Sequence, residues 1–381
     1  MAPSHILLGI ALACLIAMRG PWIKPAFWLP LAFFAAWTLV SAAASDAPLA
    51  AMPQIKKFYV FLILPVLAAA ISDVARARWL TLGTISAATL TSLLGIGQFA
   101  YKAATAGPGD FYRSYVAQRI TGMMSHWMTF GGLLMPALLM LAAFLFFARR
   151  DRRMILTGLA SAAVIATAIV LSGTRNIWLG SAIGGLYLLW HWRKWTILAT
   201  PVLLAAVVLV SPPFVKDRVV SIFQPRGEVD SNMHRVICRR VGYRMIAAHP
   251  LTGLGPERIG VHFKEYLPAD VKQPLPEGFY GHLHNIYIQY AAERGIPALL
   301  AMLWMLGTIL CDFIRARPNR QEPDRRFLLH GATAVVIGTL ASGWYEHNLG
   351  DSEVLMEFLT VISCGYAAAF PRGSRSPAPD L

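Results

Sequence analysis

The sequence is poor in charge. Only 14% of its 381 residues are charged, whereas soluble domains average about 25%. Hydrophobic residues make up 56% of the chain, and they gather in long blocks that short basic connectors separate. This composition excludes an ordinary soluble domain. It indicates a membrane protein with several spans, since each span needs about 20 mostly apolar residues.

Other signals are absent as well. The four cysteines form no CxxC pair and no disulfide framework. The chain shows no internal repeat, and the residues before the first apolar block lack the basic character of a cleavable signal peptide. No HExxH or comparable spacing supports a metal site among His262, His282 and His284. The sequence therefore predicts neither a metal nor another cofactor.

The apolar blocks predict the architecture. Every backbone polar group in lipid must be hydrogen-bonded within the protein, so helices are expected in place of the short alternating strands of a barrel. We predict an all-α integral membrane protein, a polytopic helical bundle with one large loop that contains helices. The eleven blocks lie at residues 5–18, 26–44, 58–72, 79–100, 126–147, 154–172, 176–190, 195–211, 286–314, 328–344 and 353–370.

The basic connectors predict the orientation. All of them, including Arg76, Arg78 and the run from Arg149 to Arg153, fall on one side, which the positive-inside tendency makes cytoplasmic. The net charge of +14 fits these connectors and anionic lipid headgroups better than it fits nucleic acid. The expected divisions are N-terminal transmembrane helices (1–211), an outer loop domain (212–285), C-terminal transmembrane helices (286–370) and a cytoplasmic tail (371–381).

The outer loop carries arginines without acidic neighbours. No Asp or Glu lies between residues 231 and 256. Residues 232–248 are expected to form a helix whose apolar face is Ile237, Cys238, Val241, Met245 and Ala248. Either this helix lies among lipid headgroups with snorkelling arginines, or one or two guanidinium groups bind a diphosphate. The arginines that flank the face are Arg235, Arg239, Arg240 and Arg244.

Two further arginines are candidates for anion binding. Gly253 and Gly255 permit a tight turn with exposed backbone N–H groups, and Arg258 follows them; the alternative is a plain turn. Arg175 lies in the short turn between two apolar blocks. It either snorkels to headgroups or faces a cleft and binds an anion.

Histidines and one acid complete the outer candidates. His284 stands where the polar loop meets an apolar block, at or near a predicted helix N-terminus; the positive end of the helix dipole there favours a neutral imidazole, which can act as a base. The alternative is a capping or interfacial histidine. Glu346 orients a histidine, holds a sugar hydroxyl, or belongs to a solvated turn. His126 and His282 either contact substrate or are interfacial.

Three segments resemble one family. His284-Asn285, nine residues, Gly295 and then Ala298 resembles the H-[NSQ]-x9-G-x-x-[G or small] signature of the O-antigen ligase and polymerase superfamily of bacterial envelope enzymes. Residues 250–258 (PLTGLGPER) resemble its PL-x-G-x-G element, and residues 172–176 (SGTRN) resemble its arginine turn. The resemblance covers most of the chain after about residue 120.

The resemblance implies a fold and an activity. We expect a GT-C-like bundle of about 11–12 spans in the bacterial inner membrane, with the active site facing the periplasm. The implied reaction is metal-independent, inverting transfer of a polysaccharide from undecaprenyl diphosphate to a lipid A-core hydroxyl. His284 is the implied base, and Arg175 and Arg258 are the implied diphosphate ligands.

Three alternatives stay open. A single long outer loop favours a ligase over an O-antigen polymerase, and a protein-targeted glycan ligase belongs to the same superfamily. A transporter of lipid-linked solutes is the alternative from another class. It predicts ionisable residues near the midplane and paired halves, which the sequence lacks.

Overall fold

The computed structural model describes residues 3–18, 24–107, 111–222, 224, 232–276, 278–316 and 321–371. Within these residues every regular element is an α-helix or a 3-10 helix, and there is no strand. The predicted all-α class is therefore confirmed. The predicted tail, 371–381, lies outside the described residues except for Pro371.

Helices occupy all eleven predicted apolar blocks. Among the described residues, six helical segments are long and apolar enough to cross a membrane, one of them the run of short helices Pro48–Ala70, and α1 and α2 are shorter apolar helices. The block helices are α1 (Pro3–Ala17), α2 (Trp28–Ala44), η2 (Phe58–Leu62) with α4 (Ile63–Ala70), α5 (Val74–Ala104), α7 (Trp127–Phe147), α8 (Arg152–Leu171), α9 (Arg175–Trp192), α10 (Thr196–Val210), α14 (Ile286–Arg315), α15 (Pro323–Gly343) and α16 (Ser352–Ala369).

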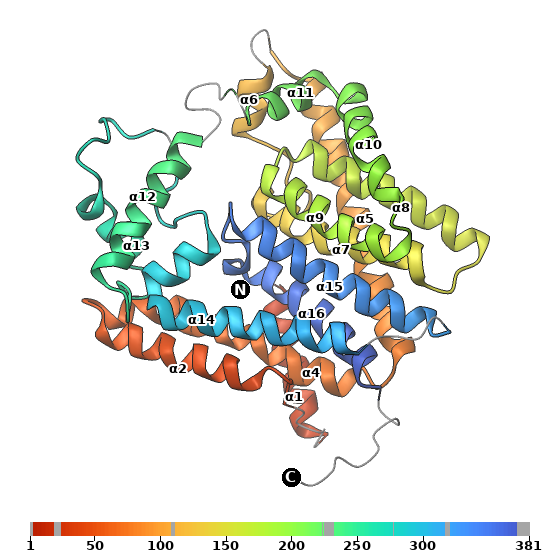
Figure 1. Cartoon of the computed structure of the whole chain (residues 1–381), viewed down its shortest axis with the longest axis horizontal. Helices are drawn as coiled ribbons and strands as arrows, with labels where there is room; N and C mark the ends of the chain where they lie inside the picture. Colours follow the sequence, from red (N-terminus) through yellow and green to blue (C-terminus); the bar gives the residue numbers. More distant parts are fainter. Residues whose placement is uncertain are drawn as a thin grey trace.

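Shorter helices form the connections. They are η1 (Pro48–Ala51), α3 (Met52–Lys57), α6 (Phe111–Ala117), α11 (Pro213–Val220), α12 (Asn232–Ala248), α13 (Ile259–His262), η4 (Phe263–Tyr266) and η5 (Asn348–Gly350). In Figure 1, α12 and α13 project beside the start of α14, whereas α6 and α11 lie near α10.

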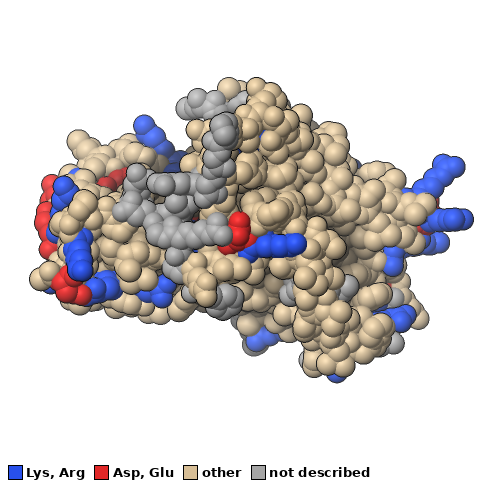
Figure 2. All heavy atoms as spheres, turned by 90° about the horizontal axis from the view of Figure 1, so that it is seen from above, with Lys and Arg blue, Asp and Glu red and all other residues tan. Residues whose placement is uncertain are grey.

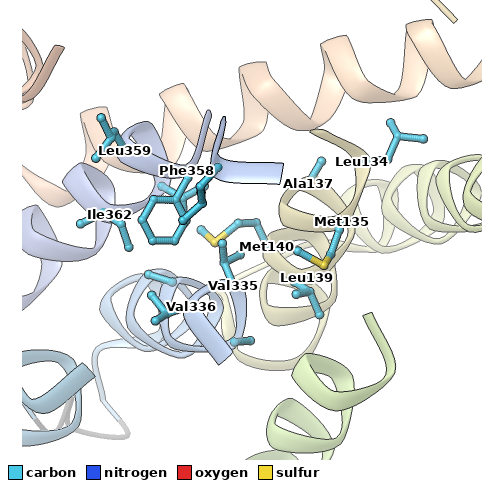
Figure 3. Close-up of a cluster of buried hydrophobic side chains, with 14 of the residues drawn as sticks. Leu134, Met135, Ala137, Leu139, Met140, Val335, Val336, Phe358, Leu359 and Ile362 are labelled. Carbon is cyan, nitrogen blue, oxygen red and sulfur yellow. The ribbon is translucent and has the colours of Figure 1, made fainter. Parts of the chain in front are cut away.

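Helix α15 is the centre of the bundle. It packs against α7, α9, α14 and α16 (Figure 1), and its Gly338 faces Gly180 of α9 so closely that a Cβ at Gly180 would lie 2.7 Å from the Gly338 carbonyl oxygen. Small residues of this kind let membrane helices approach and gain packing energy. Apolar side chains of α7, α15 and α16, such as Met140, Val335 and Phe358, fill the remaining space (Figure 3).

Charged side chains gather mostly at the two ends of the long axis (Figure 2). At one end Arg78 pairs with Asp324 at 2.8 Å, and the Arg325 Nε donates to the carbonyl oxygen of Ala368. These contacts place the connectors before α5 and α15 together, as the sequence predicted. The opposite end holds the described residues 45–57, 121–126, 171–175, 212–222, 232–276, 278–285 and 345–352, and we name it the loop end.

Helix α12 confirms the predicted helix at 232–248. Its apolar face packs on Leu254, Phe263, Leu283 and Ile288 in a separate apolar cluster. Because this face is covered by protein, the interpretation that it lies among lipid headgroups is wrong. Ala248, expected on the same face, is exposed.

Candidate active site

The site begins at the N-terminus of α14. Asn285 is the N-cap, and its side-chain oxygen accepts hydrogen bonds from the backbone N–H groups of Tyr287 and Ile288. Its amide donates to the Trp344 carbonyl oxygen at 2.9 Å, which ties α14 to the end of α15. The predicted position of His284, directly before a helix, is confirmed. His284 itself has φ +50°, a left-handed conformation that costs on the order of 1–3 kcal/mol and is typical of functional sites.

His284 and Glu346 form a buried pair. Both carboxylate oxygens of Glu346 lie 3.1 Å from the His284 Nδ1, and the two side chains are 7% and 3% exposed. The Arg235 guanidinium donates to the same carboxylate at 3.2 Å. Burial raises the pKa of Glu346, but the hydrogen bond from His284 and the charges of His284 and Arg235 outweigh it and hold the pKa well below its usual range. Glu346 is therefore a carboxylate that orients the imidazole.

The second ring nitrogen of His284 faces a backbone carbonyl. Its Nε2 lies 3.1 Å from the Phe279 oxygen, which also lies 2.9 Å from the His234 Nε2. The Glu346 carboxylate only accepts hydrogen bonds, so Nδ1 is the donor to it, and Nε2 can reach a substrate hydroxyl only after it parts from the Phe279 carbonyl. The role of His284 as a neutral base stays a prediction.

His282 packs beside this pair. Its ring centroid lies 4.0 Å from that of His284, and its Nδ1 accepts a hydrogen bond from the His284 backbone N–H at 3.2 Å. Burial and the neighbouring His284 lower the pKa of His282 to about 4, and the same causes lower the pKa of His234 to about 4. Both rings are therefore neutral near pH 7.

Three side chains of this cluster could in principle hold a metal ion. His282, His284 and Glu346 offer ligand atoms that lie within 4.8 Å of one another. However, the Glu346 carboxylate already accepts hydrogen bonds from His284 and Arg235, and a guanidinium at the same carboxylate opposes a second cation. The residues present do not favour a metal, and the expectation of metal independence stays a prediction.

A cavity of about 390 Å³ adjoins the pair. We name it the arginine cavity, because Arg175, Arg235 and Arg239 line it. Arg235 connects it directly to Glu346. The remaining lining residues are Asn176, Leu179, Ile222, Asn232, Val236 and Tyr345.

The three arginines differ in how they are held. Arg175, the first residue of α9, donates to the Asn232 side chain at 2.6 Å and to Ser221 at 3.3 Å. It therefore faces a cleft, in agreement with the alternative in which it binds an anion there. Arg239 is half-buried and forms no hydrogen bond or ion pair with any residue that the structure describes. It offers a guanidinium group to a ligand in the cavity.

The other two arginines of α12 have a different role. Arg240 pairs with Asp270 at 2.7 Å, and Arg244 donates to the Leu267 carbonyl oxygen at 2.8 Å. They fix the loop after η4 and do not line the arginine cavity. Of the four arginines among which one or two were predicted to bind a diphosphate, Arg235 and Arg239 stay as candidates.

Arg258 lies away from the arginine cavity. Its guanidinium pairs with Asp46 and lies 3.3 Å from the His262 Nε2, and no described contact joins it to Arg175 or His284. The expected convergence of Arg175 and Arg258 on one ligand is not seen in this structure. A catalytic role for Arg258 stays a prediction.

The glycine turn before Arg258 serves α14. Helix α14 breaks at Gly295 (φ +82°), and Pro297 has no N–H to donate, so carbonyl groups in the preceding turn lose their helical partners. The backbone N–H groups of Leu254 and Gly255 donate to the Ala292 and Glu293 oxygens at 3.0 and 2.8 Å. A Cβ at Gly295 would lie 1.8 Å from the Leu251 oxygen, so only glycine fits. The prediction that this turn exposes its backbone N–H groups is therefore wrong for Gly253, Leu254 and Gly255, which donate within the protein.

Sequence reasoning missed two arginines near the site. The Arg218 Nε donates to the Gly173 oxygen at 3.1 Å, and the Arg119 guanidinium lies 3.5 Å from the same oxygen. They hold the turn that precedes Arg175. Burial and the charges of Arg218, Arg235 and Arg175 lower the pKa of Arg119 well below its usual range. Apart from their charge, no motif marked these residues.

His126 has a capping role. It is the N-cap of α7, and its Nδ1 accepts a hydrogen bond from the Met128 backbone N–H at 3.2 Å. It is absent from the residues that line the arginine cavity. Its contact with substrate stays a prediction.

Fold and site together define a polytopic helical membrane protein that has an arginine-lined cavity beside a buried His–Glu pair. Residues 160–303 match the family model described as O-antigen ligase. This segment contains Arg175, Arg258 and His284, and its match supports an assignment to the O-antigen ligase family. An enzyme function of the general ligase or polymerase type follows. A search of curated proteins found no match.

Proposed function

We propose that this chain is an O-antigen ligase of the bacterial inner membrane, with its loop end in the periplasm. It would transfer a polysaccharide from undecaprenyl diphosphate to a sugar hydroxyl of lipid A-core. The observation that carries the proposal is the arginine cavity beside the His284–Glu346 pair. A diphosphate needs several charge-assisted hydrogen bonds, and the transfer needs a base within reach of the acceptor hydroxyl.

The arginines bind and stabilise the leaving group. Guanidinium groups match phosphate oxygens bidentately, and Arg175, Arg235 and Arg239 come from two helices that converge on one cavity. As the glycosidic bond breaks, negative charge grows on the diphosphate. Fixed cations at that position stabilise the transition state more than the ground state.

The bond changes are those of a single displacement. The acceptor hydroxyl oxygen forms a bond to the anomeric carbon, and the bond from that carbon to the diphosphate oxygen breaks with its electron pair leaving on undecaprenyl diphosphate. The hydroxyl proton passes to the His284 Nε2, and Glu346 stabilises the resulting imidazolium from Nδ1. The anomeric centre inverts. The acceptor hydroxyl takes the place that the Phe279 carbonyl holds next to Nε2.

Reconstitution tests the proposal. The purified chain in nanodiscs is supplied with undecaprenyl-diphosphate glycan and with either lipid A-core or a second portion of donor, without any gradient. We expect glycan on lipid A-core. A lengthened donor would instead indicate an O-antigen polymerase, a glycosylated pilin-type protein a protein-targeted ligase, and solute movement without transfer a transporter.

A histidine outside the site, His249, provides the matched control for His284. His284→Ala should abolish transfer, whereas His249→Ala, which changes a histidine hydrogen-bonded to Tyr266 at the exposed edge of the loop, should retain it. Normally capped lipopolysaccharide on a gel from cells that carry only His284→Ala would remove the base assignment.

A further inference from the structure

A second cationic cavity lies at the loop end. Its volume is about 50 Å³, and it is enclosed by α2, the α3–η2 segment, α14 and α16. Among its described lining residues, Lys57 and Arg294 are the cations. Gln54 of α3 is a neutral polar residue whose side-chain oxygen accepts a hydrogen bond from Arg294. The other walls are apolar, with Phe34, Phe58 and Met305 among them. We name it the Lys57–Arg294 cavity.

Arg294 is a buried cation with incomplete hydrogen bonding. Its side chain is 5% exposed and stands near the rings of Phe34 and Tyr290, with 5.3 and 5.2 Å from its guanidinium carbon to the ring centroids. It donates to the Gln54 side chain at 3.1 Å and forms a buried ion pair with Glu293, 3.4 Å from its Nε, although this Nε has no hydrogen-bond partner among the described residues. The ion pair offsets part of the cost of burying the guanidinium, and an anion in the cavity would complete its hydrogen bonding.

Lys57 adds a second positive charge. Its Nζ donates to the carbonyl oxygen of Gly350 at 2.8 Å and forms no ion pair with any described residue. The described residues that line the cavity include no Asp or Glu. Outside the lining, the Glu293 Oε2 faces Arg294 while its Oε1 accepts the Glu257 backbone N–H at 2.8 Å, and the charge of Asp351 interacts with that of Lys57. The walls therefore favour an anion.

A row of rings connects this cavity to His284. The Tyr290 ring lies 5.1 Å from that of His347, His347 lies 6.4 Å from His282, and His282 lies 4.0 Å from His284. The other member of the pair, Glu346, accepts a hydrogen bond from Arg235 of the arginine cavity. The His284–Glu346 pair is therefore linked to two cationic cavities, of about 390 and 50 Å³.

We propose that the Lys57–Arg294 cavity binds a phosphate group of the acceptor glycolipid. Donor and acceptor are then held by separate cationic sites: the arginine cavity on the Glu346 side of the pair and the Lys57–Arg294 cavity on the His284 side. This assignment to the acceptor rests on the proposed function. The smaller volume suits a single phosphate, and the larger cavity suits a diphosphate with its attached sugar. The apolar wall fits a ligand whose phosphate is carried on a lipid.

Lys57→Met tests this with a neighbour as control. Lys56 lies in the same helix, α3, but it is exposed and does not line the cavity. Lys56→Met therefore removes one positive charge from the same helix without changing the cavity. Binding and transfer are measured with phosphorylated lipid A-core and with the same glycolipid after phosphatase treatment. Lys57→Met should weaken acceptor binding and raise its KM roughly tenfold, the effect of losing one charge-assisted hydrogen bond, with the donor KM unchanged. Lys57→Arg should restore most of the acceptor binding.

The phosphatase arm separates a phosphate site from a structural role. The dephosphorylated acceptor should bind wild type about tenfold more weakly, and Lys57→Met should then have no further effect. Equal losses for both acceptors, a change confined to the donor KM, or an equal effect of Lys56→Met would overturn the proposal. So would equal competition by phosphatidylglycerol or by inorganic phosphate, which would indicate a general anion site. Acceptor binding is measured directly, so a chain that binds phosphorylated acceptor without transferring glycan would refute the proposed function alone.

Discussion

Two adjacent arginines of α12 offer a sharp test of the arginine cavity. Arg239 lines the cavity without a partner among the described residues, whereas Arg240 turns away and pairs with the exposed Asp270. Arg239→Met and Arg240→Met each remove one positive charge and keep much of the side-chain length. A general effect of charge on the loop would act on both variants alike, so only a local contact with the ligand separates them.

The expected difference follows from the contacts. A hydrogen bond to a charged group contributes about 1.5–3 kcal/mol, so Arg239→Met should lower donor kcat/KM by roughly 10- to 150-fold. The Arg240–Asp270 pair is solvent-exposed, and such pairs contribute about 0–1 kcal/mol to stability. Arg240 also does not line the cavity, so Arg240→Met should change donor kcat/KM by less than about fivefold. Arg239→Lys should recover part of the loss, because lysine keeps the charge but not the bidentate fork.

Initial rates with undecaprenyl-diphosphate glycan at fixed, saturating acceptor provide the measurement, and thermal unfolding shows whether each variant is folded. If Arg240→Met lost as much activity as Arg239→Met, or if Arg239→Met lost none while folded, the cavity would not be the diphosphate site. A loss seen only in the acceptor KM would refute the same reasoning.

Three further predictions concern stability and cofactors. Because the pKa of Glu346 is depressed in the folded state, its contribution to stability is present above the ordinary glutamate value of about 4.3 and declines as the pH falls below it. The melting temperature of wild type should thus drop more between about pH 5 and about pH 3 than that of Glu346→Gln. Gly295→Ala should destabilise the chain by on the order of 2 kcal/mol because its Cβ meets the Leu251 oxygen at positive φ, whereas Gly307→Ala in the same helix has open space around its Cβ and should be neutral or stabilising in thermal unfolding. Transfer should proceed unchanged after EDTA treatment and dialysis; loss restored by a divalent ion would assign a metal to His282, His284 and Glu346.

Local pattern was enough for much of the fold. The eleven apolar blocks became helices because length and hydrophobicity act within a single segment. The helix at 232–248 and the position of His284 before α14 also follow from nearby residues, through helical periodicity and through capping by Asn285. The signature around His284 further indicated the family.

The sequence by itself determined that this chain is an all-α membrane protein with a histidine at a helix start and arginines in the loop before it. Only the tertiary structure decided which groups meet. Glu346 reaches His284 across 62 positions of sequence, Arg239 but not Arg240 faces the cavity, and Arg258 binds Asp46 instead of joining Arg175. Periodicity gives the face of a helix on which a residue lies, but the neighbour of that face depends on how distant segments pack, and no local pattern encodes that.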